Sequence, residues 1–405
     1  MASATHSVLA VEGGAAVRTT PFPAWPQISS DEIEAAAVVL ASGKINYWTG
    51  EAGKLFENEF AAGVGRKRAV ALANGSVALE LALHALGIGA GHEVIVPSRS
   101  FIASASCVSM RGAVPVFADA DRESGNVTAA TLAPHISRKT KAIIVVHLGG
   151  WPCEMDAIMA LAAEHGLRII EDCAQAQGAS YKRRPMGSLG DIAIFSFCQD
   201  KIMTTGGEGG MLVTDDETFF RRAWSFKDHG KSYEAVNEPN HAAGFRWLHE
   251  SIGTNWRMTE MQSAMGRVML PKVAQRVKQR RENASLLQRG LSEITALRVP
   301  QPPPGLDCAF YRFYAYVRPE RLATGWDHDR VQTAIEAEGI PCFAGSCSEI
   351  YLEKAFAASV PKKRFPFARE LGETSLAFLV HHSLNEGEML DTIAAVQKVF
   401  RRASE

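Results

Sequence analysis

The chain has 405 residues, a length that predicts two or three domains at roughly 100–200 residues per domain. Lysine and arginine number 43 and aspartate and glutamate 44, so the formal net charge of −1 gives no electrostatic reason to expect a nucleic acid or an anionic membrane as partner. No stretch reaches the roughly 18 uncharged apolar residues of a transmembrane helix, and the N-terminus lacks the basic region of a secretory signal. We therefore expect a cytoplasmic protein of enzyme size, with no nucleic acid and no membrane among its partners.

The seven cysteines are scattered along the chain without a C-x-x-C pair. Their odd number and wide spacing favour neither a disulfide framework nor a zinc knuckle. Because no group of histidine, cysteine and aspartate has metal-ligand spacing in the sequence, we expect no metal.

The first part of the chain divides into an irregular start and a regular alternation. Residues 1–30 are predicted to be irregular, because three prolines follow one another between positions 21 and 26. From about 68 to 215, short β-branched apolar runs alternate with helical stretches, which predicts an α/β fold with a mostly parallel central sheet covered on both faces. The expected strands are Ala69–Ala73, Glu93–Val96, Val114–Phe117, Ala142–His147, Leu167–Asp172, Ile192–Phe197 and Met211–Thr214. The expected helices between them are Ser76–Leu86, Ile102–Arg111 and Met155–His165.

The second part predicts a smaller α/β lobe. Thr259–Leu287 is compatible with a long helix that Pro271 breaks softly, and Gln301–Gly305 (QPPPG) has the composition of a linker. A strand is expected at Ala309–Val317, with helices near Asp329–Glu338 and Glu388–Arg401. We thus predict an irregular segment at 1–30, a large domain at 31–275 and a small C-terminal domain at 276–405.

Four segments contain candidate catalytic or ligand-binding residues, and the most informative is Ser196–Gly210 (SFCQDKIMTTGGEGG). Lys201 follows a buried strand and precedes a glycine-rich turn, where the backbone can approach a ligand closely. A lysine held there and partly desolvated is a usable amine nucleophile, although an isolated lysine of this pattern is as compatible with a surface position beside a flexible turn. The order G-x4-GK(S/T) is absent, which excludes a Walker phosphate loop.

The second segment is Ile169–Ala179 (IIEDCAQAQGA), in which Asp172 ends an apolar strand and Glu171 points to the opposite face. An aspartate at this position can hold a proton on a heteroaromatic nitrogen, or it can simply cap a helix. Ligands of parallel sheets collect at the carboxyl ends of the strands, and Asp172, Ser196 and Lys201 all lie at or just beyond such ends.

The last two segments follow other strands of the predicted sheet. In Ala73–Leu79 (ANGSVAL), Gly75 and Ser76 open a helix whose N-terminus suits a phosphate, although Ser76 could equally be only the N-cap. In Pro97–Ala103 (PSRSFIA), Phe101 is either a stacking partner for a flat cofactor or a core residue.

Taken together, the four segments resemble the DegT/DnrJ/EryC1/StrS family of pyridoxal-phosphate-dependent sugar aminotransferases. The family pattern NG(S/T)-x2-AL, P-S-x-(S/T)-(F/Y/W)-x-A, ED-x-A-(Q/H)-x-x-GA, SF-x3-K-x4-GEGG and G-x-N-(Y/W)-R-M is met in order from about 70 to 260. The opening GGAAVRTTPFPAWP, the phrase SGKINYWTGEAGKLFENEFA and the tail FLVHHSLNEGEM also resemble family flanks. The likeness therefore covers nearly the whole chain.

The resemblance implies the aspartate-aminotransferase-like fold, which is fold type I of the pyridoxal-phosphate enzymes, and pyridoxal 5'-phosphate as cofactor. It implies that Lys201 is the Schiff-base lysine and that Asp172 pairs with the pyridinium nitrogen. Gln175 is then the contact of the phenolic oxygen, and Phe101 stacks on the ring. The implied phosphate ligands are Gly75, Ser76 and Ser196, with Asn255 (in GTNWRM) reaching in from the other subunit of a homodimer with shared active sites.

The chain departs from the family pattern in two places around the lysine. One more glycine than in the commonest spacing lies between Lys201 and Glu208, and the residues CQD stand before the lysine in place of the frequent x-P-T. Some members carry a histidine in place of the lysine and perform dehydration, so the presence of Lys201 argues against that branch.

By resemblance, the reaction moves an amino group from an amino acid, expected to be glutamate, to the keto sugar of a nucleotide sugar, in deoxyamino-sugar or polysaccharide biosynthesis. The NWRM phrase leans to a 4-keto-hexose. A keto-cyclitol aminotransferase is the alternative among enzymes. A non-catalytic cofactor-binding regulator is the alternative of another class, and the near-neutral charge speaks against it.

Overall fold

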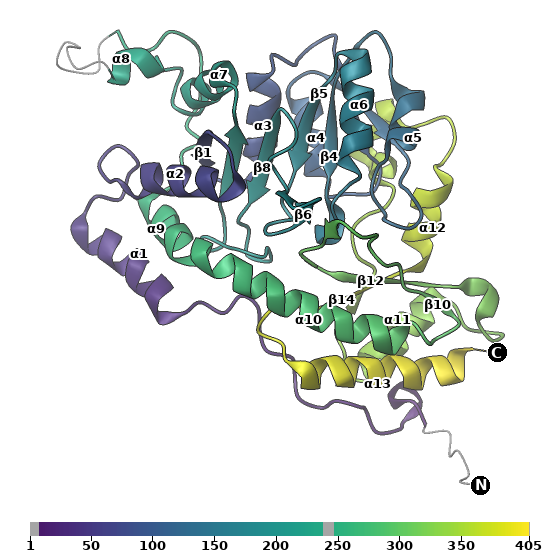
Figure 1. The fold of residues 1–405 in the computed structure, drawn as a ribbon. Coiled ribbons are helices and arrows are strands. Elements are labelled where there is room, and N and C mark those ends of the chain that lie inside the picture. Colours follow the sequence, from purple (N-terminus) through teal and green to yellow (C-terminus); the bar gives the residue numbers. More distant parts are fainter. Residues whose placement is uncertain (1–7, 238–246, 405) are drawn as a thin grey trace.

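The computed structural model describes residues 8–237 and 247–404, and its largest element is a seven-stranded sheet with the order β1-β9-β8-β5-β4-β2-β3 (Figure 1). The five strands from β8 to β3 in this order run parallel, and β9 is antiparallel to both of its neighbours. The predicted mostly parallel α/β sheet is therefore confirmed. Its strands are β1 (Arg68–Leu72), β2 (Glu93–Pro97), β3 (Val114–Ala118), β4 (Thr140–Val146), β5 (Arg168–Asp172), β8 (Ile192–Ser196) and β9 (Gly210–Thr214).

Both faces of this sheet are buried, as the continuous apolar strand sequences require. On β4, Ile143 and Val145 pack into a core cluster with helices α2 and α6, whereas Ala142 and Ile144 pack into a second cluster with α3, α4 and α7. Because successive side chains of a strand point to opposite faces, each strand contributes residues to two separate cores. These helices are α2 (Ala52–Val64), α3 (Gly75–Ala85), α4 (Ala103–Met110), α6 (Met155–His165) and α7 (Glu217–Lys227).

A long rod of helix leads from the large sheet to the second half of the chain, as Figure 1 shows. It consists of α9 (Glu260–Met269) and α10 (Val273–Leu291), separated by one 3-10 turn at Leu270–Lys272 that contains Pro271. The predicted soft break at this proline is confirmed. Thr259 opens α9 with a capping box, because its hydroxyl accepts from the backbone N–H of Gln262 while the Gln262 side chain accepts from the backbone N–H of Thr259.

A four-stranded antiparallel sheet, with the order β10-β12-β14-β13, forms the core of the second half together with α10, α11 and α13. The prediction that its main strand begins at Ala309 is wrong, since β12 begins at Phe313. The reason is that the backbone N–H groups of Ala309 and Tyr311 donate to the carbonyls of Gly150 and Gly149, at 2.9 and 2.8 Å, and so attach this stretch to the loop after β4. The elements are β10 (Leu297–Arg298), β12 (Phe313–Val317), β13 (Cys342–Phe343), β14 (Ser375–Phe378), α11 (His328–Ala337) and α13 (Glu386–Ala403).

The remaining elements are short or peripheral. The predicted linker 301–305 connects β10 to β11 without helix or strand, and β11 belongs to a small three-stranded sheet of order β11-β6-β7. None of the helices in the described ranges is long and apolar enough to cross a membrane. The other elements are α1 (Ser30–Ser42), α5 (Ala129–Leu132), α8 (Tyr233–Asn237), α12 (Pro366–Thr374), β6 (Ser180–Tyr181), β7 (Arg184–Pro185) and β11 (Leu306–Asp307). Further 3-10 turns lie at Ala10–Glu12, Ala133–His135, Leu148–Gly150, Pro319–Arg321, Ile350–Leu352 and Lys354–Ser359.

Candidate active site

The candidate site lies at the carboxyl ends of the parallel strands, where the sequence places it. Asp172 is the last residue of β5 and Ser196 the last residue of β8, and both are buried. Lys201 follows in the loop that leaves β8. The positive charge of Lys201 acts on the Asp172 carboxylate, so the structure brings these two residues into one electrostatic environment.

Asp172 is a buried carboxylate, only 6% exposed. Its Oδ2 accepts from the Ser104 hydroxyl at 3.1 Å, and its Oδ1 accepts from the backbone N–H of Ala174 at 3.1 Å. Burial raises the pKa of Asp172, while these two hydrogen bonds and Lys201 oppose that shift. Within the described ranges no cationic group hydrogen-bonds the carboxylate. The helix-capping alternative is wrong, because the Ala174 contact closes a turn and the next regular element is the strand β6.

Lys201 is held in a compact loop and is not a free surface lysine, since its side chain is only 15% exposed. Its Nζ lies 3.7 Å from Oδ1 of Asp200 and 4.7 Å from the centre of the Tyr311 ring. The loop is closed by threonines, because the Thr204 hydroxyl donates to the carbonyl of Phe197 at 2.9 Å. These contacts restrict where the lysine amine can reach.

The additional glycine of this loop has a conformational explanation. Gly206 and Gly207 have φ angles of +82° and +109°, in the left-handed region that residues with a side chain rarely adopt. The Thr205 hydroxyl donates to the carbonyl of Glu208 at 2.6 Å and fixes the turn that these glycines form. The additional glycine therefore lies in an ordered turn that follows the lysine.

Gly75 and Ser196 are in direct contact, and Ser76 is exposed beside them. A Cβ at Gly75 would lie 2.7 Å from the Cβ of Ser196, so only glycine allows this approach of α3 to β8. Asn74 is the N-cap of α3, since its side chain accepts from the backbone N–H of Val77 at 3.0 Å, and the N-cap alternative for Ser76 is wrong. Because Asn74 caps the helix, the hydroxyl of Ser76 is not needed as a cap and is available to an anion at the helix N-terminus.

The other predicted site residues occupy separate positions around this edge of the sheet. Oε1 of Gln175 accepts from the backbone N–H of Gly149 at 2.7 Å. Phe101 is 66% exposed in the turn between β2 and α4, so the core alternative for this ring is wrong. Asn255 is exposed, and its backbone forms an isolated antiparallel bridge with Asp228. Arg257, two residues further on, forms a similar bridge with Leu72 at the end of β1.

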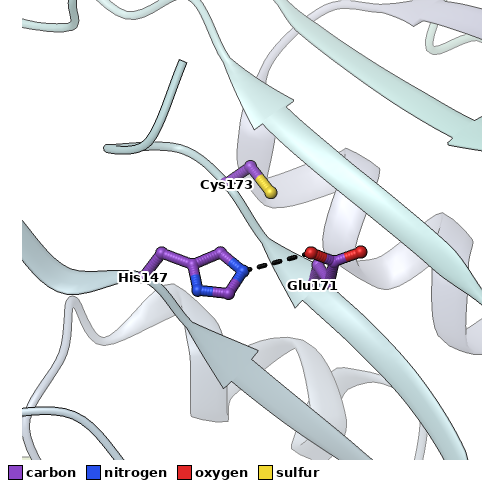
Figure 2. Close-up of side chains that lie close together, drawn as sticks. All are labelled: His147, Glu171 and Cys173. Carbon is purple, nitrogen blue, oxygen red and sulfur yellow. Dashed lines mark hydrogen bonds and ion pairs between the residues drawn. The ribbon is translucent and has the colours of Figure 1, made fainter. Parts of the chain in front are cut away.

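The side chains of His147, Glu171 and Cys173 form a buried group beside Asp172 (Figure 2). This group was not predicted from the sequence. Glu171 does point to the opposite face from Asp172, as strand alternation predicts. Its carboxylate accepts from His147 Nε2 at 3.3 Å and from three backbone N–H groups at 2.6–3.0 Å. Burial raises the pKa of Glu171, but the histidine and the backbone donors outweigh it and hold that pKa below its ordinary value.

The potential ligand atoms of this group lie within 4.8 Å of one another, a juxtaposition that the spacing along the sequence does not reveal. The ligand atoms of His147 and Glu171 nevertheless already form hydrogen bonds within the protein. His147 Nδ1 accepts from the backbone N–H of Cys153 at 3.1 Å, so the ring proton sits on Nε2 and is donated to Glu171. Burial raises the pKa of the Cys173 thiol, which keeps it protonated and a poor metal ligand. We therefore assign this group an anchoring role next to Asp172.

Comparison with known proteins identifies the family. The fold matches that of an aminotransferase from Psychrobacter cryohalolentis, which is 50% identical with a TM-score of 0.93 over 94% of this chain and 99% of that one. The family model described as the DegT/DnrJ/EryC1/StrS aminotransferase family matches residues 26–397. The chain belongs to this family. It is a pyridoxal-phosphate-dependent aminotransferase, as the resemblance implies.

Two relatives illustrate the range of substrates within the DegT/DnrJ/EryC1/StrS family. A UDP-N-acetyl-3-dehydro-alpha-D-glucosamine 3-aminotransferase from Acidithiobacillus ferrooxidans is 36% identical, over 90% of this chain and 93% of its own length. An L-glutamine:2-deoxy-scyllo-inosose aminotransferase from Streptomyces paromomycinus is 34% identical, over 98% of both chains.

The residues present fit the family's cofactor. Asp172 is a buried carboxylate without a cationic hydrogen-bond partner in the described part of the chain, and a protonated pyridine nitrogen supplies that partner. The close approach of Gly75 to Ser196 brings the Ser196 side chain to the N-terminus of α3, where the exposed Ser76 also lies, and a helix N-terminus suits a phosphate. Lys201 provides an amine whose charge acts on Asp172.

Proposed function

We propose that this aminotransferase moves the amino group of an amino acid, with glutamate as donor, to the ketone of a nucleotide-linked sugar. The observation that carries the proposal is the placement of Lys201 beside a buried carboxylate, Asp172, that has no cationic hydrogen-bond partner in the described ranges. The relative from Acidithiobacillus ferrooxidans, named for a UDP-linked keto sugar, supports the substrate class.

Each site residue then has a chemical role. Bound pyridoxal phosphate supplies an electron sink for the negative charge left when a proton departs from the substrate carbon. Lys201 Nζ would bond the aldehyde carbon of the cofactor between turnovers. Once released, it would take the proton from the substrate carbon as a base and deliver it as an acid to that cofactor carbon. Asp172 holds a proton on the pyridine nitrogen, and the opposite charge offsets the burial of its carboxylate. Gln175 contacts the phenolic oxygen, and the exposed ring of Phe101 stacks on the cofactor.

For the cofactor phosphate, we propose Gly75, Ser76 and Ser196 as ligands from one subunit and Asn255 from the other subunit of a homodimer. The exposure of Asn255 supports a contact with a second copy of the chain. A two-fold axis makes such a contact reciprocal, so each subunit completes the site of its partner. All seven cysteines are free thiols, which supports the proposed cytoplasmic location, where thiols stay reduced.

A keto-cyclitol is the second candidate substrate. The relative from Streptomyces paromomycinus, named for 2-deoxy-scyllo-inosose, is 34% identical over 98% of this chain. The two candidates differ in charge, because a nucleotide-linked sugar carries phosphates and a keto-cyclitol carries none.

The experiment is a substrate panel for the purified, cofactor-loaded protein with glutamate as donor. The acceptors are nucleotide-linked hexoses with the ketone at carbon 3 or at carbon 4, and 2-deoxy-scyllo-inosose, with product masses measured for each. We expect an amino sugar nucleotide and 2-oxoglutarate in equal amounts, with the 4-keto sugar as the expected acceptor. Amination of the cyclitol alone establishes the alternative. No amination of any acceptor, with glutamate unconsumed, refutes the proposal and favours a non-catalytic regulator.

A further inference from the structure

A group of cationic and aromatic side chains lies on α10, outside the residues assigned so far. We call Arg276, Arg280, Trp25 and His382 the α10 cluster. Arg276 and Arg280 are four residues apart and therefore share one face of the helix. The Trp25 ring meets the His382 ring edge-on, with 4.8 Å between centres, and the Arg280 guanidinium lies 5.7 Å from the centre of the Trp25 ring.

The α10 cluster has an excess of positive charge. Arg280 is 1% exposed, and its guanidinium donates to the carbonyls of Phe310 and Tyr311, at 3.1 and 3.4 Å, with no carboxylate partner in the described ranges. Burial, together with the charges of Arg312 and Arg276, lowers the pKa of Arg280 to about 9. Within the part of the chain that the structure describes, Arg276 alone of the cluster has a carboxylate partner, which is Glu32 at 2.8 Å. A buried guanidinium without a counter-ion is costly, which indicates that an anion is missing.

The unpaired polar atoms of the cluster point to the same conclusion. Nη1 of Arg276, Nε of Arg280, Nε1 of Trp25 and Nδ1 of His382 are all buried and have no hydrogen-bond partner among residues 8–237 and 247–404. The first three are N–H donors. Since native proteins leave few buried polar groups unpaired, four in one group of contacting residues indicate an absent ligand with several acceptor atoms. Carboxylate and phosphate oxygens have that property, and both match arginine well.

The cluster is connected to the proposed catalytic residues through Tyr311. The carbonyl of Tyr311 accepts from Arg280, and the ring of the same residue lies 4.7 Å from Nζ of Lys201. Arg312 follows Tyr311 in the chain, and its charge acts on Arg280 and on Asp200, the neighbour of Lys201. Tyr311 is therefore the residue that contacts both Arg280 of the cluster and Lys201.

We propose that the α10 cluster binds an oxyanion group of a substrate, which is a carboxylate of the amino donor or a phosphate of the nucleotide-linked sugar. This inference rests on the proposed function for the identity of those two substrates. It assigns Arg276, Arg280, Trp25 and His382 to substrate binding and leaves proton transfer to Lys201.

Isothermal titration calorimetry of the cofactor-loaded protein tests the proposal with two probes. Glutarate represents the donor carboxylates, and inorganic pyrophosphate represents the sugar-nucleotide phosphates. Arg280→Met removes the buried charge and keeps similar bulk. Trp25→Phe removes the Nε1 donor and keeps an aromatic ring, although a smaller one. Because Trp25 lies in an irregular segment, this variant remains informative if the first one does not fold. Lys278→Gln is the control, because it removes one positive charge from the same helix at a side chain that is 78% exposed.

We expect at least one probe to bind Arg280→Met at least tenfold more weakly and Trp25→Phe several-fold more weakly, while Lys278→Gln stays within twofold of the native protein. Weakened glutarate binding identifies the donor as the source of the anion, and weakened pyrophosphate binding identifies the nucleotide sugar. If neither probe binds the native protein, or if folded variants bind both probes as the native protein does, the proposal is wrong. The substrate panel above reports on the proposed function independently, because an active native enzyme with unaltered probe binding in the variants refutes the α10 cluster alone.

Discussion

Glu171→Gln removes one negative charge from the interior next to Asp172 and leaves the size of the side chain almost unchanged. In the native protein, Oε1 of Glu171 accepts from the backbone N–H groups of Leu189 and Gly190, and Oε2 accepts from His147 and from the backbone N–H of Gly187. Glutamine has one oxygen and one NH2 group, so it can satisfy only one of these two pairs of donors. The other pair faces a group that itself donates.

The expected destabilisation follows from this count. A hydrogen bond to a charged group contributes roughly 1.5–3 kcal/mol, and a buried donor left without an acceptor costs roughly 1–3 kcal/mol. Two donors lose their acceptor in the variant. The buried guanidinium of Arg66, whose Nη2 lies 3.8 Å from Oε1 of Glu171, also loses a carboxylate partner, and breaking a buried ion pair costs about 3–5 kcal/mol in general. We therefore expect Glu171→Gln to lower the free energy of unfolding by about 3–5 kcal/mol at pH 7.

Urea denaturation of both proteins at several pH values is the assay. The pKa of Glu171 in the folded protein is held below its ordinary value of 4.5, so its carboxylate stabilises the fold fully above that value and loses this contribution as the pH falls through the folded pKa. The difference between native protein and variant is thus largest at neutral pH and shrinks as the pH falls below 4.5. Cofactor binding should weaken in parallel, because Asp172 is the next residue of β5.

Glu164→Gln on α6 is the control, since this glutamate is exposed, and we expect a change within about 0.5 kcal/mol. The reasoning is refuted if Glu171→Gln costs less than about 1 kcal/mol at pH 7, or if its cost does not depend on pH. Either result means that the carboxylate is not the acceptor on which the 187–190 loop and His147 depend.

Three further predictions concern the proposed catalytic residues. Lys201→Ala should stay folded, because the residue lies in a loop, and should lose both turnover and the visible absorbance of the lysine-bound cofactor; near-normal transamination would refute the assignment. Asp172→Asn should still bind the cofactor through its phosphate while the rate, measured at saturating substrate, falls by at least about a hundredfold; an unchanged rate removes Asp172 from catalysis. Mixing inactive Lys201→Ala with inactive Asn255→Ala should restore activity, because in a mixed dimer with shared sites one site carries both defects and the other carries neither. If heterodimers form, as native mass spectrometry can establish, and activity does not return, Asn255 serves its own subunit.

The sequence was most informative where one type of pattern dominated. The seven strands of the large sheet lie within two residues of their predicted ends, because fully buried parallel strands have continuous apolar sequences. Helices α1 and α2 were not predicted. In α1 most of the apolar residues are exposed or half-buried, so its sequence has no clear apolar face.

Contacts between distant segments were not predictable in the same way. The group of His147, Glu171 and Cys173 depends on β4 and β5 being neighbours in register, with Val146 opposite Asp172. The late start of β12 depends on carbonyls more than 150 positions earlier in the chain, at Gly149 and Gly150. Neither has a local signal, whereas Lys201 and Asp172 could be found because each sits at a strand end within a recognisable motif.

The attachment of Ala309 and Tyr311 to Gly149 and Gly150 limits how the two halves of the enzyme can move. A Cβ at Gly149 would lie 3.0 Å from the Tyr314 ring, and one at Gly150 would lie 2.8 Å from the backbone nitrogen of Phe310, so both positions are closed to other residues. The segment that holds Ala309 and Tyr311 is therefore fixed closely against the loop after β4. Because Tyr311 belongs to this segment and its hydroxyl donates to Asp200, its ring is held against Lys201 from both ends, by the backbone and by the side chain.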